Sequence, residues 1–426
     1  VMESSKNKHY ADFLESVTHN KLLNKINPIA ASKSEDELRS SDELAKGLSE
    51  ALIEHEPYFS DYKEMIENGP SRLQLYDNID ISYLSLFSYN SQDESKPIEE
   101  RQKWANYFTE QSIKIYGEPD AEIVNQIERG EAREIFKEYD PIFAEVKDWL
   151  NRKYKNVFSV LDIEDHRTDK LSPDEVYDFF TNGLDAIKHE DKRFSDWKVE
   201  MKPGAAVLSC EADEKSIKVG QNRAMMDPKK LKGLFAHEAL RHAMTAVNAE
   251  ELGIESALPQ YINTEEGFAK IYELSMTGEF PQLTMDNYSD IGWSLGQIDG
   301  QKHTRRELID RKIQRKINRG QKVTEKTMKA AESSAARVFR GTPGSDEVSG
   351  IFTKDISYFE GLVPGLKYIK TRLDAGDQID EIMAFASAAK FNLYDEQHQK
   401  YIKQRIMGKH ILNSRLMLSL PKEQTK

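Results

Sequence analysis

Apolar side chains recur every three or four positions through much of the first third of the chain, which indicates amphipathic helices. Leu44, Leu48 and Leu52 follow the capping-box spacing of residues 40–43, and Pro57 ends that segment. Similar amphipathic stretches lie at about residues 97–116, 119–136 and 140–153. None of these segments carries visible chemistry.

A further capping box begins at Ser172, with Pro173 at the first helical position, and opens a helix with one apolar stripe. We place a domain boundary just before this helix. The sequence therefore predicts a helical N-terminal region, residues 1–170, and a second domain, residues 171–426.

The pattern then changes to a period of two residues, which is typical of strands. Trp197, Val199 and Met201 alternate with polar residues, residues 205–209 are apolar, and residues 216–219 are strand-like after a polar turn. We expect a small antiparallel sheet. The strand at 216–219 is either an ordinary hairpin strand or an edge that pairs with an extended substrate.

Two helices are predicted after the sheet. Asp227 and Pro228 provide an N-cap and first turn for a helix that runs to about Ala249, and a second helix begins near Thr264. Helical patterns fill most of the remaining chain. The fold class expected is mostly helical α+β.

Composition narrows the class of protein. The chain has 426 residues, 38% hydrophobic and 31% charged, with no apolar run near the length of a membrane span and no apolar signal core at its N-terminus. We expect a soluble, cytoplasmic protein, and the single cysteine, Cys210, suits a reducing compartment. The net charge of −13 argues against nucleic acid or an anionic membrane as partner. The basic stretch from Arg305 to Arg319 is interpreted as a solvated helix face.

The candidate chemistry lies in the first of the two helices, where His237 and Glu238 are followed by His242. Two histidines can hold zinc and a glutamate beside them can act as general base. On a regular α-helix, residues five apart point roughly 140° from each other, so the two rings could not share a metal. We therefore predict a π-bulge or a break just after Glu238, which would bring His242 back to the face of His237.

A catalytic zinc keeps three protein ligands and one open position for water. The next helix begins with Glu265 and Glu266, two adjacent carboxylates that could provide the third ligand. Glu238 would take a proton from the water and pass it to the leaving amine. A chance occurrence of the motif is the alternative, and the remaining histidines are interpreted as surface or locally bonded residues.

These residues, together with later motifs, resemble a known family. The motifs are His237-Glu238-x-x-x-His242, TEEGFA at 264–269, RVFRG at 337–341 and FTKDISY at 352–358, and the likeness extends to residues 27–28, 116–119 and 384–386. In this order they are similar to the microtubule-associated tyrosine carboxypeptidases and their bacterial QEGLA-motif relatives. The likeness covers nearly the whole chain.

The resemblance implies a zinc carboxypeptidase with a zincin-like core and one zinc ion per chain. By this resemblance the metal ligands are His237, His242 and Glu266, and the base is Glu238. Glu266 is preferred to Glu265 because the bacterial motif has glutamine at the latter position. Tubulin is not carried over as substrate, because an acidic protein would repel an acidic tail unless its cleft is basic.

Four further residues are candidates for the cleft. Arg337, Arg340 and Lys354 could bind a substrate carboxylate, and Tyr358 could donate to the oxyanion formed during the reaction. Packing and structural ion pairing are equally good interpretations of each.

Three functions follow from this sequence. The first is a zinc metallopeptidase that removes C-terminal residues from a peptide or protein. The second is an endopeptidase or amidase with another substrate, and the third is a helical regulatory or binding protein with a structural or vestigial metal site. The sequence leaves the oligomeric state open.

Overall fold

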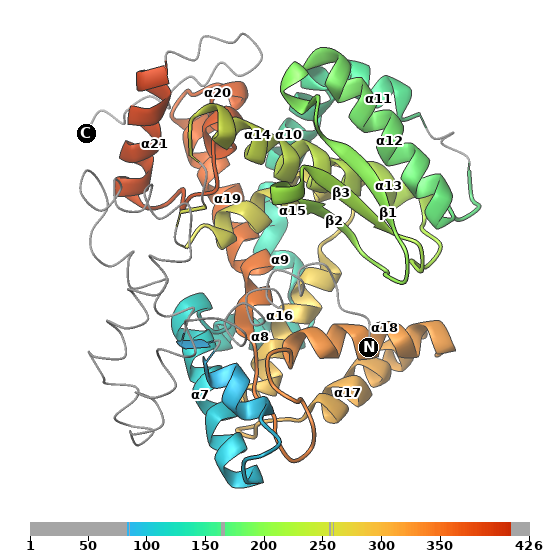
Figure 1. Ribbon diagram of the computed structural model, residues 1–426, viewed down its shortest axis with the longest axis vertical. Helices are drawn as coiled ribbons and strands as arrows, with labels where there is room; N and C mark the ends of the chain where they lie inside the picture. The colour runs from blue at the N-terminus through green and yellow to red at the C-terminus, as the bar shows by residue number, and fades with distance from the viewer. Residues whose placement is uncertain (1–82, 85, 163–166, 255–256, 259, 410–426) are drawn as a thin grey trace.

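The computed structural model describes residues 83–84, 86–162, 167–254, 257–258 and 260–409 (Figure 1). Helices dominate this part of the chain, and one three-stranded sheet accompanies them, so the fold is mostly helical α+β as predicted. Before the sheet, residues 86–92 are helical, and the labelled helices of the described region are α7 (Ile98–Tyr116), α8 (Ala121–Glu128), α9 (Arg133–Phe136), α10 (Asp140–Lys153), α11 (Lys155–Val160) and α12 (Pro173–Glu190). After the sheet they are α13 (Pro228–Phe235), the π-helix η4 (Ala236–Ala243), α14 (Met244–Glu251), α15 (Ile262–Thr277), α16 (Gln282–Ser294), α17 (Arg305–Asn318), α18 (Glu325–Val338), α19 (Ser357–Asp374), α20 (Ile379–Ala386) and α21 (Glu396–Lys409).

Two of the three helices predicted between residues 97 and 153 are single helices in the structure. The stretches 97–116 and 140–153 are α7 and α10. The stretch 119–136 is divided into α8 and α9, because the chain turns at Gly130, whose φ of 77° favours glycine. The segment at 40–57 and the dipeptide at 27–28 lie outside the described residues.

The sheet is mixed, not antiparallel throughout. Its strands are β1 (Lys198–Lys202), β2 (Leu208–Glu211) and β3 (Ser216–Gly220), in the order β1-β3-β2. β3 pairs antiparallel with β2, as predicted, but parallel with β1. The prediction was wrong for that pair because β3 lies between the two earlier strands instead of beside β2 alone.

The link from β1 to β2 crosses the end of β3, and Gly220 makes room for it. A Cβ atom at Gly220 would lie 2.4 Å from the Ala205 carbonyl oxygen and 2.5 Å from the Val207 nitrogen. Since β3 is paired on both sides, residues 216–219 cannot add a substrate strand, and that interpretation was wrong. β2 is an edge of the sheet.

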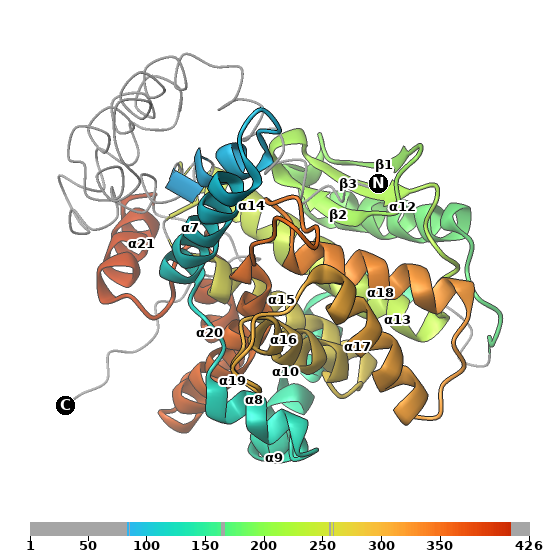
Figure 2. The same ribbon diagram turned by 90° about the horizontal axis from the view of Figure 1, so that it is seen from below.

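One hydrophobic cluster extends from Val124 to Ile406. Its centre is α15, which packs against α10, α13, η4 and α19. Residues on both sides of the predicted boundary at 170/171 belong to this cluster. In Figure 1 the sheet and α12 lie to the right of α15, and α16, α17 and α18 lie below it; Figure 2 shows the molecule from below.

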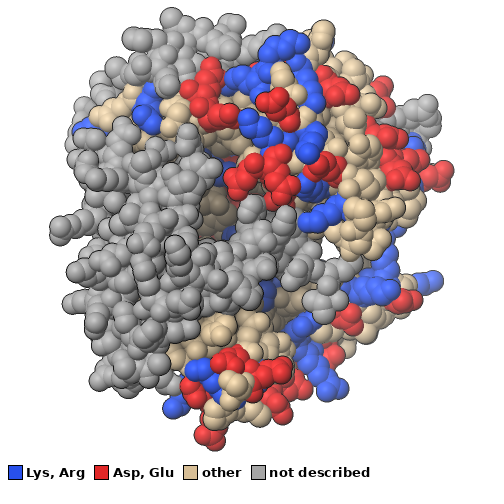
Figure 3. Space-filling model, viewed as in Figure 1, with Lys and Arg blue, Asp and Glu red and all other residues tan. Residues whose placement is uncertain are grey.

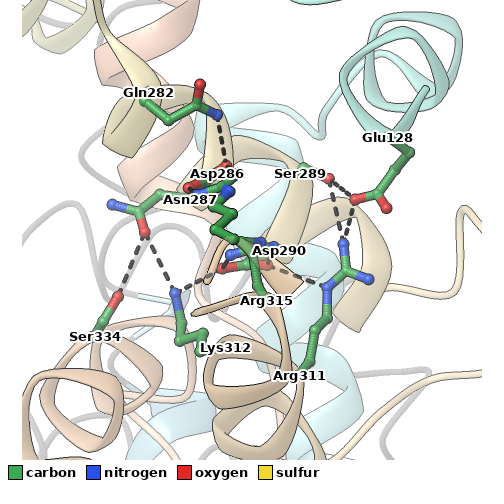
Figure 4. A network of polar contacts seen from close by, with 11 residues as sticks. Glu128, Gln282, Asp286, Asn287, Ser289, Asp290, Arg311, Lys312, Arg315 and Ser334 are labelled. Carbon is green, nitrogen blue, oxygen red and sulfur yellow. Dashed lines mark hydrogen bonds and ion pairs between the residues drawn. The ribbon is translucent and has the colours of Figure 1, made fainter. Parts of the chain in front are cut away.

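Much of the basic stretch from Arg305 to Arg319 is engaged with α16 and is not a simple solvated face (Figure 4). Asp290 is fully buried and accepts from Lys312 Nζ at 2.6 Å and from Arg315 Nη1 at 3.0 Å. Arg311 Nε lies 3.2 Å from the same carboxylate. These cations hold the pKa of Asp290 well below its usual value, although burial acts in the opposite direction.

Charges of both signs are mixed over the described part of the face seen in Figure 3. Among the described helices, none combines the length and apolar character needed to cross a membrane.

Candidate metal centre

The helix that carries the two histidines is irregular where the sequence requires it to be. Asp227 caps its start by accepting from the Lys229 amide at 3.0 Å, and Pro228 occupies the first turn. The chain then passes without a break through α13, η4 and α14, and η4 is a π-helix of eight residues. The predicted distortion is therefore confirmed, and it is longer than a single bulge.

The π-helix brings the two imidazoles together. Its i→i+5 hydrogen bonds place residues five apart one above the other, instead of on separate faces. The ring centroids of His237 and His242 are 4.8 Å apart, with an angle of 71° between the planes.

Glu266 of α15 completes a buried cluster with these histidines. Its Oε2 lies 3.8 Å from His237 Nε2 and 3.7 Å from His242 Nε2. All three side chains are buried, and their ligand atoms lie within 4.8 Å of one another. This cluster could hold a metal ion, and it is the only such group of three or more residues in the described part of the chain.

The separations suit a small divalent metal ion such as zinc. Bonds of 2.0–2.2 Å in a tetrahedral site separate neighbouring ligand atoms by about 3.4 Å. The two N–O separations are only a few tenths of an ångström longer than this. Two imidazoles and one carboxylate leave a fourth position open, as in catalytic zinc sites and unlike closed structural ones.

A carboxylate fixes the outer nitrogen of each histidine. His237 Nδ1 lies 2.8 Å from Glu273 Oε2, and His242 Nδ1 lies 2.7 Å from Glu265 Oε1. A proton on Nδ1 satisfies these contacts and leaves the Nε2 lone pair of each ring directed at the metal position.

Each of these carboxylates also contacts a cation. Arg241, fully buried, donates to Glu265 at 2.9 Å, and Lys270 donates to Glu273 at 3.0 Å. Burial raises the pKa of Glu265, but Arg241 and His242 outweigh it and lower the value to about 2. Lys270 and His237 likewise overcome burial and lower the pKa of Glu273 to about 2. Both groups are therefore carboxylates at neutral pH.

The protonation of His242 follows from this network. Burial lowers its pKa, but hydrogen bonds to Glu265 and Glu266 raise it to about 9. At neutral pH the His242 ring therefore carries a proton on both nitrogens. A metal ion that binds Nε2 must displace the proton on that atom.

Sequence reasoning missed the roles of Glu265 and Glu273. Glu265 was considered only as a rival ligand, and Glu273 was not considered. The available signal was spacing, since Glu273 follows Glu266 by seven residues and lies on the same face of α15 two turns later.

Glycine after Glu266 allows α15 to approach α19 closely. A Cβ atom at Gly267 would lie 2.2 Å from the carbonyl carbon of Gly361, and one at Gly361 would lie 1.9 Å from the Asn263 carbonyl oxygen. The Glu-Gly pair therefore combines a metal ligand with the contact that positions its helix.

Glu238 lies between the metal cluster and the edge strand. Its Oε1 is 3.9 Å from His237 Nε2, and its Oε2 accepts from the Cys210 amide of β2 at 2.9 Å. The carboxylate is thus held beside the ligands without being one of the three. Burial and the Glu238 charge raise the pKa of the Cys210 thiol well above its ordinary value, which agrees with an inert cysteine.

The predicted arginines of the cleft share one carboxylate. Arg337 binds Asp355 through two hydrogen bonds of 2.7 and 2.9 Å, and Arg340 contacts the same group at 3.1 Å. Asp355 raises the pKa of Arg337, and Tyr358 and Glu266 add to this, so Arg337 lies within the field of the metal cluster. Substrate binding by either arginine stays a prediction.

Lys354 and Tyr358 lie near these arginines in the chain. Lys354 belongs to the short 3-10 helix η5 (Thr353–Ile356), and Tyr358 lies in the first turn of α19. Lys270 Nζ is 5.8 Å from the centre of the Tyr358 ring. The proposed roles of both residues stay predictions.

Three other histidines of the described region have local contacts or are exposed. His303 lies between Asp299 and Glu307. His398 Nδ1 accepts from a backbone amide, and His189 is exposed at the end of α12. His9, His19, His55, His166 and His410 lie outside the described residues.

Comparison of the chain with models of protein families, with curated proteins and with solved structures gave no match. The family likeness therefore stays a prediction from the motifs, and the metal centre stands on its own geometry.

Proposed function

We propose that this protein is a zinc metallopeptidase with a zincin-like core, and that it releases C-terminal residues from a peptide or protein. The observation that carries the proposal is the convergence of His237, His242 and Glu266 with a fourth position left open and Glu238 held beside them. A purely structural site has no use for a carboxylate in that place.

His237, His242 and Glu266 would hold the zinc ion. When bound, zinc acts as a Lewis acid that makes water more acidic and polarises the substrate carbonyl. Glu238 then accepts the proton of the attacking water on its free oxygen and donates it to the nitrogen of the leaving residue. The Cys210 amide keeps the other oxygen in place.

The arrangement of β2 and η4 supports the comparison with zincins. The edge strand of the sheet runs beside the helix that carries the ligands, and its amide reaches the proposed base. An extended peptide would therefore pass close to both β2 and the metal. The single cysteine suits a reducing compartment, and we place the reaction in the cytoplasm.

The test combines metal analysis with peptide release. Purified protein should contain one zinc ion per chain, and His237→Ala should lose both the metal and the release of terminal residues from a peptide panel. Glu238→Gln should keep the metal and lose turnover. His189→Ala, which changes an exposed histidine, is the matched control and should do neither.

Two outcomes would redirect the proposal. Cleavage within peptides whose C-termini are blocked would indicate an endopeptidase. Bound zinc without turnover of any amide, and no effect of Glu238→Gln, would favour a regulatory or binding protein.

A further inference from the structure

Lys390 lies in the loop after α20, and hydrogen bonds join this loop to α14 and to the segment between α14 and α15. The Lys390 carbonyl accepts from the Leu258 amide at 2.8 Å. Three residues earlier, the Ser387 carbonyl accepts from Asn248 Nδ2 of α14 at 2.9 Å. The loop therefore has a fixed position beside the ligand helices.

The Lys390 ammonium is placed at the start of α15. Its Nζ lies 5.7 Å from the centre of the Tyr261 ring, and the Tyr261 carbonyl accepts from the Glu265 amide one turn later. Burial lowers the pKa of Lys390, but Tyr261, Glu265, Cys210 and Glu266 together raise it above its ordinary value. The ammonium is a half-buried cation that interacts electrostatically with Glu266 of the metal cluster and with Cys210 of the edge strand.

Within the described part of the chain, no carboxylate forms an ion pair with Lys390. Glu265 is bound to Arg241 and His242, and the arginines predicted for carboxylate binding already share Asp355. A half-buried charge without a counterion is unfavourable, and an anionic ligand removes that cost.

We propose that Lys390 binds the free C-terminal carboxylate of the substrate and thereby selects chain ends over internal peptide bonds. This inference rests on the proposed peptidase function. The terminal carboxylate lies about one residue, or roughly 3.5 Å of chain, beyond the reacting carbonyl, so its binding group must be close to the metal. The Lys390 ammonium faces Tyr261, the N-cap residue of α15, and the ligand Glu266 follows in the next turn of that helix.

The same geometry would make an internal peptide bond a poor substrate. A chain that continued past Lys390 would place a neutral peptide group against the ammonium. The charge would then stay unpaired and lose water as well. Lysine acts here as a point charge, so an arginine at this position should retain part of the effect.

The experiment compares acetyl-Ala-Ala-X tripeptides, with X covering all twenty amino acids, as free acids and as C-terminal amides. Zinc-loaded full-length wild type, Lys390→Met and Lys390→Arg are assayed, and binding of the same peptides to Glu238→Gln and to the Glu238→Gln/Lys390→Met double variant is measured by calorimetry. Lys367→Met, on the exposed side of α19, is the control for loss of one positive charge.

Lys390→Met should raise KM for the acids about 10- to 100-fold, leave kcat and zinc content nearly unchanged, and abolish the preference for acids over amides. Lys390→Arg should restore part of that preference, and Lys367→Met should behave as wild type. Unchanged acid preference in an active, zinc-loaded Lys390→Met would overturn the inference and leave the peptidase proposal standing.

The binding measurement separates the two proposals. If wild type cleaves nothing but acids bind Glu238→Gln better than amides, and the Glu238→Gln/Lys390→Met variant lacks that difference, the carboxylate site stands and the peptidase proposal fails. If acids and amides bind equally, the carboxylate site is refuted whatever the turnover.

Discussion

Replacement of Glu265 by glutamine tests the polar support behind the metal ligands. Glu265 is buried and accepts from His242 Nδ1 at 2.7 Å and from Arg241 Nη2 at 2.9 Å. Glu265→Gln keeps the shape of the side chain but removes its charge. The fully buried Arg241 then has no carboxylate in contact among the described residues.

Two effects of different size are expected. Removal of one member of a buried ion pair costs about 3–5 kcal/mol of unfolding free energy. Loss of the carboxylate behind a metal-bound histidine weakens metal affinity about 10- to 100-fold. The first should appear in urea unfolding of the metal-free protein, and the second in competition for zinc with a chelator.

A second substitution separates these effects. In Arg241→Met/Glu265→Gln no buried charge is left unpaired, so much of the stability should return while the zinc affinity stays low. Glu131→Gln, which breaks an exposed pair with Arg129, is the control and should change stability by less than about 1 kcal/mol. Wild-type stability and zinc affinity in Glu265→Gln would show that this carboxylate supports neither Arg241 nor the metal ligand His242.

Four further predictions follow from the same contacts. Gly267→Ala places a Cβ atom 2.2 Å from the Gly361 carbonyl carbon, so it should lower the unfolding free energy by about 1–3 kcal/mol and weaken zinc binding, as measured by urea unfolding and chelator competition. Zinc affinity should rise about tenfold per pH unit between pH 6 and about 9 and then level off, because the pKa of His242 is raised to about 9 and its proton must leave; a flat profile in competition titrations would contradict this. Glu238→Gln should lower kcat by about 10²- to 10⁴-fold at unchanged zinc content, as followed by terminal-residue release. Asp290→Asn leaves the surrounding cations without their shared carboxylate and should cost about 3 kcal/mol in urea unfolding while zinc content stays at the wild-type value.

The sequence predicted those features that depend on local spacing. Apolar periodicity located α7 and α10, and the caps at Ser172 and Asp227 marked the starts of α12 and α13. The irregular helix followed from geometry alone, because histidines five apart can converge only if the helix is not regular.

Features that depend on the path of the chain were not predicted. Strand periodicity does not reveal that β3 lies between β1 and β2, since that order depends on where the intervening link passes. The charge of Arg315 predicts that its side chain is exposed, but it forms an ion pair with the buried Asp290 of another helix. Lys390 was missed for the same reason, because its loop reaches α15 only through tertiary contacts.

If His237, His242 and Glu266 bind one metal ion, X-ray absorption at the zinc edge of the loaded protein will detect these side chains as its neighbours. We predict one zinc per chain with about four nitrogen and oxygen neighbours at about 2.0–2.1 Å, two of them imidazoles. His242→Ala should remove one imidazole contribution. A sulfur neighbour at about 2.3 Å, or a first shell without histidine, would contradict the account.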